Sequence, residues 1–223
     1  MWTSIIKKFS TYSLIILLSA CTSLESPKEQ QSTASVATAA IASAHPLATQ
    51  AGMDVLNQGG NAFDAAIAVA ASLGVVEPYS AGIGGGGFWL LYDAKNDDYR
   101  FLDARETAPA AAHENYYLTA QGKVNRDKSI NGPTAAGIPG QAAAFVYLAE
   151  HYGKLSLKKS LAAAIEQAEY GFPVNEYYRT LMGYRLDAVR RYPDSASILL
   201  DNNQIPEKGY LLKQVDLANT LKA

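Results

Sequence analysis

The stretch Gly82-Ile83-Gly84-Gly85-Gly86-Gly87-Phe88-Trp89-Leu90-Leu91-Tyr92-Asp93 organises the chain, and a polar turn leads from it into Phe101-Leu102-Asp103-Ala104-Arg105-Glu106-Thr107-Ala108-Pro109. Four consecutive glycines leave a short piece of backbone without side chains. The apolar run that follows them is typical of a strand buried on both faces. Because Lys95-Asn96-Asp97-Asp98 is a polar turn cluster, we predict a β-hairpin whose second strand delivers Arg105 at its edge.

Three interpretations of the glycine run Gly84-Gly85-Gly86-Gly87 compete. A nucleotide cradle requires a strand before the glycines and a helix after them. Here the strand-like segment Phe88-Trp89-Leu90-Leu91-Tyr92 follows them, and no Lys-Ser/Thr pair comes after. Close packing of the backbone against another layer, or left-handed turns, is the interpretation that we favour. The functional alternative is a wall at the mouth of an active site where a side chain would obstruct a substrate.

Four segments together resemble the γ-glutamyltranspeptidases (γ-glutamyltransferases). They occur in the family's order and at about its spacing, and they are Gln58-Gly59-Gly60-Asn61-Ala62-Phe63-Asp64-Ala65-Ala66, Gly84-Gly85-Gly86-Gly87-Phe88, Asp103-Ala104-Arg105-Glu106-Thr107-Ala108-Pro109 and Gly137-Ile138-Pro139-Gly140. The resemblance extends from about Ala39 to the end of the chain. A single motif of this kind is a weak signal, whereas four in register are a specific one.

The resemblance implies a fold. The family belongs to the N-terminal-nucleophile hydrolases, which are α/β (α+β) proteins built as an αββα four-layer sandwich. Residues 36–223 are then expected to be a helix-rich N-terminal part of the large subunit. The last amphipathic segment ends without a stop signal, so we expect the chain to be cut short.

The resemblance also implies a reaction, which needs no cofactor. In the family a precursor cleaves itself, and the new N-terminal threonine of the small subunit attacks the γ-glutamyl amide of glutathione or a similar substrate. The amine of that threonine can act as base, and backbone amides stabilise the oxyanion. Water, an amino acid or a peptide amine then takes the acyl group. Thr107 and Thr134 are internal threonines without a cleavage context, so we expect no catalytic residue here and no activity from this chain alone.

Arg105 is the residue that we assign to substrate binding. Taken by itself, it has an ordinary explanation, namely an ion pair with Asp103, Glu106 or a distant carboxylate. The functional explanation is recognition of a substrate carboxylate, because the planar guanidinium makes two parallel charge-assisted hydrogen bonds. In the family that the chain resembles, the matching arginine holds the α-carboxylate of the γ-glutamyl group, which favours the functional explanation. The role of Glu106 stays open.

The N-terminus resembles a bacterial lipoprotein signal peptide. Lys7 and Lys8 supply a positive region, and Leu14 to Leu18 form an apolar core too short to span a bilayer. Leu18-Ser19-Ala20-Cys21 matches the pattern in which the cysteine becomes the lipidated first residue after cleavage. The alternative is an ordinary signal peptide cut nearby, with Cys21 incidental. Because Cys21 is the one cysteine in the chain, an intramolecular disulfide is excluded.

These features divide the chain into a signal peptide (1–20), a flexible tether (21–35) and the family-like part (36–223). The tether is rich in Ser, Thr, Gln, Glu and Lys. Acyl chains on Cys21 are expected to hold the protein on a membrane without a spanning helix. The expected location is the bacterial cell envelope, on the periplasmic side, and the Thr22 that follows the cysteine favours the outer membrane.

Apolar periodicity and punctuation by glycine and proline predict the remaining elements. Asn61 is a good cap for a helix that is apolar all round. The predicted helices are 46–57, 63–76, 141–152, 157–170, 175–191 and 211–223, with a short helix at 110–117, a first strand at 36–43, and loops at 123–129 and 193–209.

Composition excludes some functions. The formal net charge is −2, and no cluster of Lys and Arg is present, which argues against nucleic acid as a partner. The histidines His45, His113 and His151 are far apart and have no partner at helical spacing, so we predict no metal site from them. We expect them to be surface or capping residues.

Two further hypotheses stand beside the γ-glutamyltransferase. One is a related N-terminal-nucleophile acylase, such as a cephalosporin acylase or a poly-γ-glutamate-processing relative, on the same scaffold. The other is a short, non-catalytic lipoprotein that binds small acidic ligands. The Arg-Glu-Thr-Ala-Pro segment that begins at Arg105 favours the γ-glutamyltransferase over the related acylase. The last predicted helix, which has no stop signal, argues against the short lipoprotein.

Overall fold

The computed structural model describes residues 38–223. The chain divides into two units, Met1–Ala40 and Ile41–Ala223, and every element below belongs to the second. The predicted signal peptide, Cys21 and the tether lie outside the described residues. Residues 38–43 form no strand, so the predicted first strand is wrong for these residues. The side chain of Ile41 packs instead against a small apolar cluster on two helices, formed by Ala51, Val55, Ala65 and Ala68.

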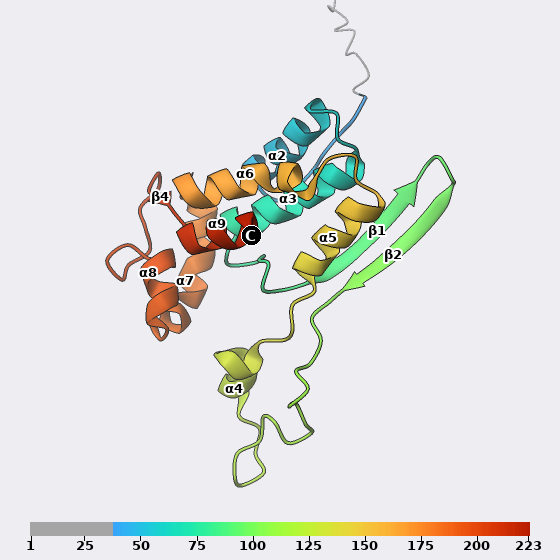
Figure 1. The fold of residues 1–223 in the computed structure, drawn as a ribbon. Coiled ribbons are helices and arrows are strands. Elements are labelled where there is room, and N and C mark those ends of the chain that lie inside the picture. The colour runs from blue at the N-terminus through green and yellow to red at the C-terminus, as the bar shows by residue number, and fades with distance from the viewer. Residues whose placement is uncertain (1–37) are drawn as a thin grey trace, which may run out of the picture. The chain divides into compact units, whose positions relative to one another are not determined.

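Helices form the core of the Ile41–Ala223 unit (Figure 1). The central helix is α3 (Ala62–Val76), which packs against α2 (Pro46–Asn57), α5 (Gln141–His151) and α6 (Leu157–Tyr170). The core residues of α3 are almost inaccessible to solvent, and they include Ile67, Ala68, Ala71, Val75 and Val76. The prediction of a buried helix is confirmed for most of α3, although Ala66, Val69, Ala70 and Leu73 are only half-buried. Within residues 38–223 no helix has the length and apolar character that crossing a bilayer requires.

Side-chain caps fix where α2 and α3 begin. The Asn61 side chain accepts hydrogen bonds from the backbone N–H groups of Phe63 (2.9 Å) and Asp64 (3.0 Å), and the Asp64 carboxylate accepts one from the Asn61 N–H (2.9 Å). His45 caps α2 through Nδ1, which accepts a hydrogen bond from the Leu47 N–H (3.2 Å). Burial lowers the pKa of His45, although the nearby Glu77 opposes this shift. The expectation that His45 is a capping residue is confirmed.

The predicted hairpin is present as β1 (Gly87–Asp93) and β2 (Asp98–Ala104), paired antiparallel with Gly87 opposite Ala104. Its inner face packs on α5, where the Trp89 ring meets the Phe145 ring edge-on at 6.1 Å. The turn places Asp97 at φ 50°, in the left-handed region, and the Asp93 carboxylate accepts a hydrogen bond from the Lys95 N–H (3.0 Å). Both observations explain why a polar cluster forms the turn.

The expectation that the first strand is buried on both faces is wrong. Successive residues of β1 point to opposite faces, and the outer face is exposed: Phe88 is 60 % accessible and Leu90 75 %. Phe101 of β2 lies on the same face and stacks on Phe88, with ring centroids 5.4 Å apart. The reason is that the described residues supply a layer on one side of the hairpin only.

A long excursion leaves the hairpin after β2 and returns at α5 (Figure 1). It contains α4 (Arg126–Ile130) and the 3₁₀ turn η2 (Pro133–Ala135). The predicted helix at 110–117 is wrong, because turns occupy this segment. The predicted loop at 123–129 is wrong in part, since Asn125 caps α4 by accepting a hydrogen bond from the Lys128 N–H (3.1 Å).

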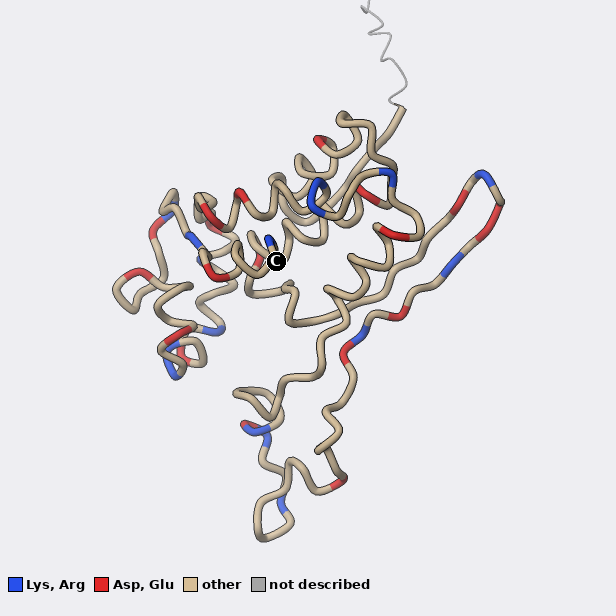
Figure 2. The backbone as a smooth tube through the Cα atoms, in the orientation of Figure 1, with Lys and Arg blue, Asp and Glu red and all other residues tan. Residues whose placement is uncertain are grey.

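The C-terminal part packs against α6 and contains α7 (Glu176–Arg190), α8 (Pro193–Leu199) and α9 (Val215–Lys222). The predicted loop at 193–209 is wrong for α8, which begins with a proline at its first position. The predicted helix at 211–223 begins only at Val215, because Leu211–Leu212 (β4) pairs with Phe172–Pro173 (β3). Charges of both signs are interspersed along the described chain (Figure 2).

Candidate functional site

Arg105 follows directly after the end of β2, and its guanidinium is accessible. The backbone N–H of Arg105 donates a hydrogen bond to the Asp103 carboxylate (2.9 Å). The side chain is 59 % exposed, and Nη1 lies 3.2 Å from Oε2 of Glu106. The guanidinium carbon is also 6.0 Å from the centre of the Phe88 ring. The ordinary explanation, an ion pair with Glu106, therefore holds in part, but it leaves most of the guanidinium free to bind a ligand.

Arg105 and Glu106 form one wall of a cavity of about 400 Å³. The opposite wall is the loop between α3 and β1. The lining residues are Pro78, Tyr79, Ser80, Ala81, Gly82, Gly84, Gly85, Gly86, Arg105 and Glu106. Arg105 therefore lies in a cavity whose other lining residues include several glycines, so few side chains fill the space next to its guanidinium.

Two glycines hold the backbone next to Arg105. A Cβ on Gly86 would stand 2.1 Å from the carbonyl oxygen of Ala104, and a Cβ on Gly140 would stand 2.3 Å from the same atom. Both distances are far inside van der Waals contact, and the obstructing atom belongs to the backbone. The sequences Gly84–Gly87 and Gly137–Gly140 thus meet on either side of the peptide that carries Arg105.

The segments around Arg105 and Gly140 are also hydrogen-bonded to each other. The N–H of Thr107 donates to the carbonyl of Ile138 (3.1 Å), and the N–H of Ile138 donates to the carbonyl of Thr107 (2.8 Å). The carbonyl of Gly85 accepts hydrogen bonds from the N–H groups of Gly140 (3.2 Å) and Gln141 (3.1 Å). Three of the four motifs therefore converge on Arg105.

The four consecutive glycines do not share one role. Close packing is confirmed at Gly86, whereas Gly84 has open space around it and Gly87 has only the Gln141 side chain at 3.9 Å. The left-handed alternative is wrong, because the described glycines with positive φ are elsewhere in the chain. Gly84, Gly85 and Gly86 line the cavity, as the functional alternative requires.

The opposite wall is stiffened by buried polar and aromatic groups. Glu77 is 5 % exposed, and its carboxylate accepts a hydrogen bond from the Ser80 hydroxyl (3.0 Å). The Tyr79 ring packs edge-on against Tyr177 and Tyr178, at 5.9 Å and 5.7 Å. Burial, helped by the negative charge of Glu77, raises the pKa of Tyr79. The Tyr79 phenol therefore stays protonated at neutral pH.

Arg105 is the one cation among the described residues that line this cavity. None of its described lining residues is a threonine, cysteine or histidine. Thr107 and Thr134 lie elsewhere: the Thr134 hydroxyl donates to the carbonyl of Lys128 (2.7 Å), and the backbone of Thr107 pairs with Ile138. The arrangement is an exposed guanidinium at the edge of a cavity that is lined mainly by small residues.

The sequence analysis identified Arg105 but not its surroundings. It gave no function to Gly137-Ile138-Pro139-Gly140, although Gly140 is in place against the Arg105 peptide. The sequence signal that could have revealed this contact was a second glycine-rich motif. The residues next to a glycine do not show which distant backbone segment packs against it. The wall formed by residues 78–81 was not anticipated either, since contacts across the cavity have no sequence periodicity.

Comparison with known proteins places this scaffold in a family. Residues 48–223 match the family model "Gamma-glutamyltranspeptidase". The chain is 37 % identical over 183 residues to the glutathione hydrolase proenzyme of Bacillus subtilis (strain 168), covering 82 % of this chain and 31 % of that relative. It is 40 % identical over 184 residues to the capsule biosynthesis protein CapD proenzyme of Bacillus anthracis, covering 82 % of this chain and 30 % of that relative.

Solved structures show the same likeness. The γ-glutamyltranspeptidase of Helicobacter pylori superposes with a TM-score of 0.78 at 36 % identity, covering 81 % of this chain and 52 % of that chain. The fold is thus that of an N-terminal-nucleophile hydrolase scaffold, mixed α and β and rich in helix, as expected. The chain belongs to the γ-glutamyltranspeptidase family. It spans about a third of the length of the curated relatives that it matches.

Proposed function

We propose that the intact protein is a γ-glutamyltransferase/glutathione hydrolase, and that this chain supplies its scaffold and the arginine that binds the substrate α-carboxylate. The observation that carries the proposal is the exposed guanidinium of Arg105 in a glycine-walled cavity, inside the family's own motif. Family membership supports the reaction, and the cavity supports the position of the substrate.

Arg105 acts in this proposal by orientation. Its guanidinium takes the α-carboxylate in two charge-assisted hydrogen bonds, which fixes the position of the γ-amide at the other end of the substrate. Gly86 and Gly140 fix the Ala104–Arg105 peptide, which fixes the point from which the Arg105 side chain starts. Glu106 lies on one side of the guanidinium (3.2 Å), which leaves the other edge for the ligand.

The nucleophile belongs to the rest of the protein in this proposal. Relatives such as the Bacillus subtilis glutathione hydrolase are named proenzymes, which supports a precursor that is cleaved into a large and a small subunit. An N-terminal threonine of the small subunit would form the γ-glutamyl enzyme, and water or an amine would take the acyl group. The substrate is glutathione or another γ-glutamyl amide.

We further propose that the protein is a lipoprotein of the bacterial cell envelope. Cys21 stands at the end of a short apolar segment after Lys7 and Lys8, which is the order that lipidation requires. Acyl chains on Cys21 would anchor the protein to a membrane.

A kinetic experiment on the full-length gene product tests the proposed function. Release of p-nitroaniline from γ-glutamyl-p-nitroanilide is expected for the natural sequence. Since each charge-assisted hydrogen bond contributes about 1.5 to 3 kcal/mol, Arg105→Ala is expected to raise KM by roughly one to two powers of ten per bond lost. Arg105→Lys is expected to be defective as well, because an ammonium does not reproduce the planar fork.

The control for this experiment is Arg100→Ala, which removes the same charge from β2, the strand that ends just before Arg105. Arg100 pairs with Asp98 near the hairpin turn and does not line the cavity, so its loss is expected to leave KM within about twofold. Normal KM and kcat in Arg105→Lys would remove the assignment of Arg105.

A γ-glutamyl polymer is the second candidate substrate. The 40 % identity to the CapD proenzyme is as high as the identity to the glutathione hydrolases above, so the family likeness does not favour a small substrate by itself. Measuring kcat/KM for glutathione and for poly-γ-glutamate with the same preparation decides between the two.

A further inference from the structure

Residues 109–136, which we name the arm, contain no buried residue. The contrast with α3 is sharp, since α3 buries most of its residues. A segment without a buried apolar core opens at low free-energy cost. The position of the arm on the molecule therefore depends on its polar contacts.

Hydrogen bonds tie the arm together internally. The Lys128 ammonium donates to the carbonyl of Tyr116 (2.6 Å) and lies 5.1 Å from the centre of that ring. The Thr134 hydroxyl donates to the carbonyl of Lys128 (2.7 Å), and the Tyr117 hydroxyl donates to the carbonyl of Thr134 (3.1 Å). These contacts join the two halves of the arm, so it moves as one piece.

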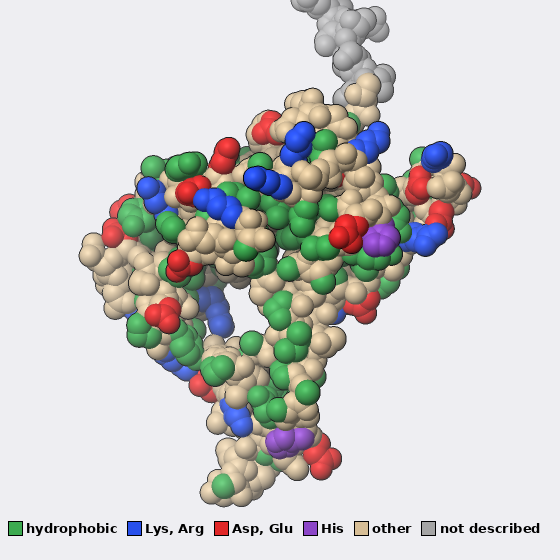
Figure 3. All heavy atoms as spheres, viewed as in Figure 1, with side chains coloured by type: hydrophobic (Ala, Val, Ile, Leu, Met, Phe, Trp, Pro, Cys, Tyr) green, Lys and Arg blue, Asp and Glu red, His purple; other side chains and the backbone are tan. Residues whose placement is uncertain are grey.

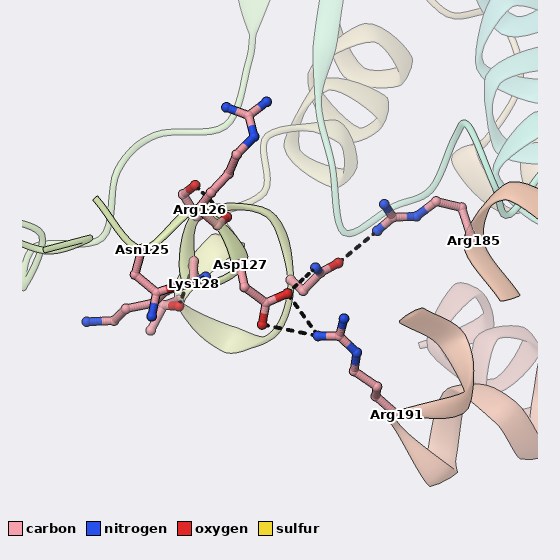
Figure 4. Close-up of polar contacts among 9 residues, drawn as sticks. Asn125, Arg126, Asp127, Lys128, Arg185 and Arg191 are labelled. Carbon is pink, nitrogen blue, oxygen red and sulfur yellow. Dashed lines mark hydrogen bonds and ion pairs between the residues drawn. The ribbon is translucent and has the colours of Figure 1, made fainter. Parts of the chain in front are cut away.

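A small group of polar side chains, which we name the latch, connects the arm to α7 and the residue after it (Figure 4). Nη1 of Arg191 donates to both carboxylate oxygens of Asp127, at 2.8 Å and 3.1 Å. Asn131 donates to the same carboxylate (2.8 Å) and accepts a hydrogen bond from Arg185 (3.1 Å). The hydrogen bonds from Arg191 and Asn131 hold the pKa of Asp127 below its ordinary value, so the carboxylate is charged at neutral pH.

The other end of the arm joins the molecule beside Arg105. The chain segments that lead into and out of the arm pair with each other at the Thr107–Ile138 bridge. Next to this bridge, a Cβ on Gly137 would stand 2.8 Å from the Cβ of Glu106. In the described chain the arm is thus attached at a narrow neck, at the latch and at Gly132, where a Cβ would stand 2.8 Å from the hydroxyl oxygen of Tyr192. In the space-filling view an opening lies between the arm, α7 and the body of the unit (Figure 3).

The latch is weak by construction. The side chains of Arg191 and Asp127 are 52 % and 60 % exposed. An exposed ion pair of this kind shifts the equilibrium between the attached and the released arm by only about fivefold or less. Salt screens such pairs. Because the neck is narrow and the arm has no core, release of the latch frees the arm without disturbing the helical core.

We infer that the arm is a hinged strap held on α7 by Asp127, Asn131, Arg185 and Arg191, and that its release widens the approach to Arg105 for bulky γ-glutamyl substrates. The substrate class rests on the proposed function, whereas the hinge and its latch rest on the contacts above. In this proposal the latch controls how large a substrate can reach Arg105, and it does not change the chemistry at the amide.

Hydrogen exchange on the full-length gene product tests the latch. In Arg191→Glu, where two carboxylates face each other, amide exchange across residues 115–131 is expected to rise about two- to fivefold, with little change in α3. Asp127→Lys combined with Arg191→Glu is expected to restore slow exchange, because the pair is present in reverse. Arg126→Ala is the matched control: it removes a positive charge from α4, and its side chain points away from the latch (Figure 4).

Chemical modification tests the widening without needing catalysis. Phenylglyoxal and the same reagent attached to a long polyethylene glycol chain both modify arginine, and peptide mass spectrometry reports the rate at Arg105. In Arg191→Glu the rate with the bulky reagent is expected to rise about two- to fivefold relative to the small one, and the charge-reversed double variant is expected to reverse this. Unchanged exchange in Arg191→Glu, or faster exchange with an unchanged ratio of rates, overturns the proposal.

Measuring turnover distinguishes failure of the strap proposal from failure of the proposed function. If the gene product cleaves γ-glutamyl-p-nitroanilide, Arg191→Glu is expected to raise kcat/KM for poly-γ-glutamate relative to the anilide by the same two- to fivefold. An unchanged ratio overturns the size control. If no γ-glutamyl substrate is cleaved, the proposed function fails while the exchange and modification results still decide the hinge.

Discussion

At the scale of single residues, the carbonyl oxygen of Ala104 determines where Arg105 stands. Side chains at Gly86 and Gly140 would both occupy the space of this oxygen. Neither glycine has a left-handed φ, so close approach, rather than backbone conformation, requires glycine there.

Gly86→Ala therefore tests the positioning of Arg105. Its Cβ would stand 2.1 Å from a backbone atom, so the Ala104–Arg105 peptide has to move, and a displacement of about 1 Å can reduce kcat/KM about 100-fold. Overpacking is also expected to reduce stability by about 1 to 3 kcal/mol. Steady-state kinetics and thermal melting of the full-length protein measure the two effects.

Gly87→Ala is the matched control, because the neighbouring glycine has only a flexible Gln141 atom at 3.9 Å. It is expected to fold and to retain kcat/KM within a few-fold. Equal losses from both substitutions would show that the glycine run acts through flexibility and not through contact with Ala104.

The sequence singles out Arg105 as a candidate binding residue, whereas the surroundings of Arg105 could not be predicted from it. Arg105 stands in a motif that follows a readable strand. Its partners lie on segments that are about 20 and 35 residues away in the sequence, at Gly86 and Gly140. The sequence shows that a glycine leaves room where a side chain would be, but it does not show which atom occupies that room.

At the scale of elements, Asp64 joins the start of α3 to the turn between α5 and α6. Besides capping α3, its carboxylate accepts hydrogen bonds from the N–H groups of Lys154 (3.0 Å) and Leu155 (3.3 Å), in the turn between α5 and α6. Asp64 is fully buried, and a Cβ on Gly153 would stand 2.7 Å from its Oδ1. One carboxylate thus organises both the start of α3 and this turn.

Asp64→Ala is expected to destabilise the protein by about 3 kcal/mol or more, because three backbone N–H groups lose their partner. Asp54→Ala removes an exposed carboxylate of α2 that contacts only Gln50 (2.7 Å) in the described chain, and it is expected to cost less than about 0.5 kcal/mol. Denaturant unfolding of the full-length protein measures both. Similar costs for the two variants would contradict the role given to Asp64.

The helices that the sequence predicted well are the long ones with an apolar stripe, such as α3, α5 and α6. The helices that it missed, α4 and α8, are one to two turns long and bury no residue. Periodicity does not reveal such short elements, which depend on tertiary contacts and on local caps.

At the scale of the whole molecule, the described residues form a helical core with a hairpin that is covered on one side. The outer face of the hairpin, with Phe88, Leu90 and Phe101 exposed, is why the prediction of two buried faces is wrong. The apolar residues of a strand show that the strand is to be covered. They do not show whether the covering layer belongs to the described residues. An apolar face of this extent predicts low solubility for residues 36–223 expressed alone.

The most direct test of the account compares two substrates on the full-length protein. γ-Glutamyl-p-nitroanilide and 4-aminobutyryl-p-nitroanilide differ only in the α-carboxylate. If Arg105 holds that group, the natural protein prefers the first substrate strongly in kcat/KM, and Arg105→Ala reduces this preference by about 10- to 100-fold. The same preference in both proteins would show that the α-carboxylate is bound elsewhere, and would contradict the central claim.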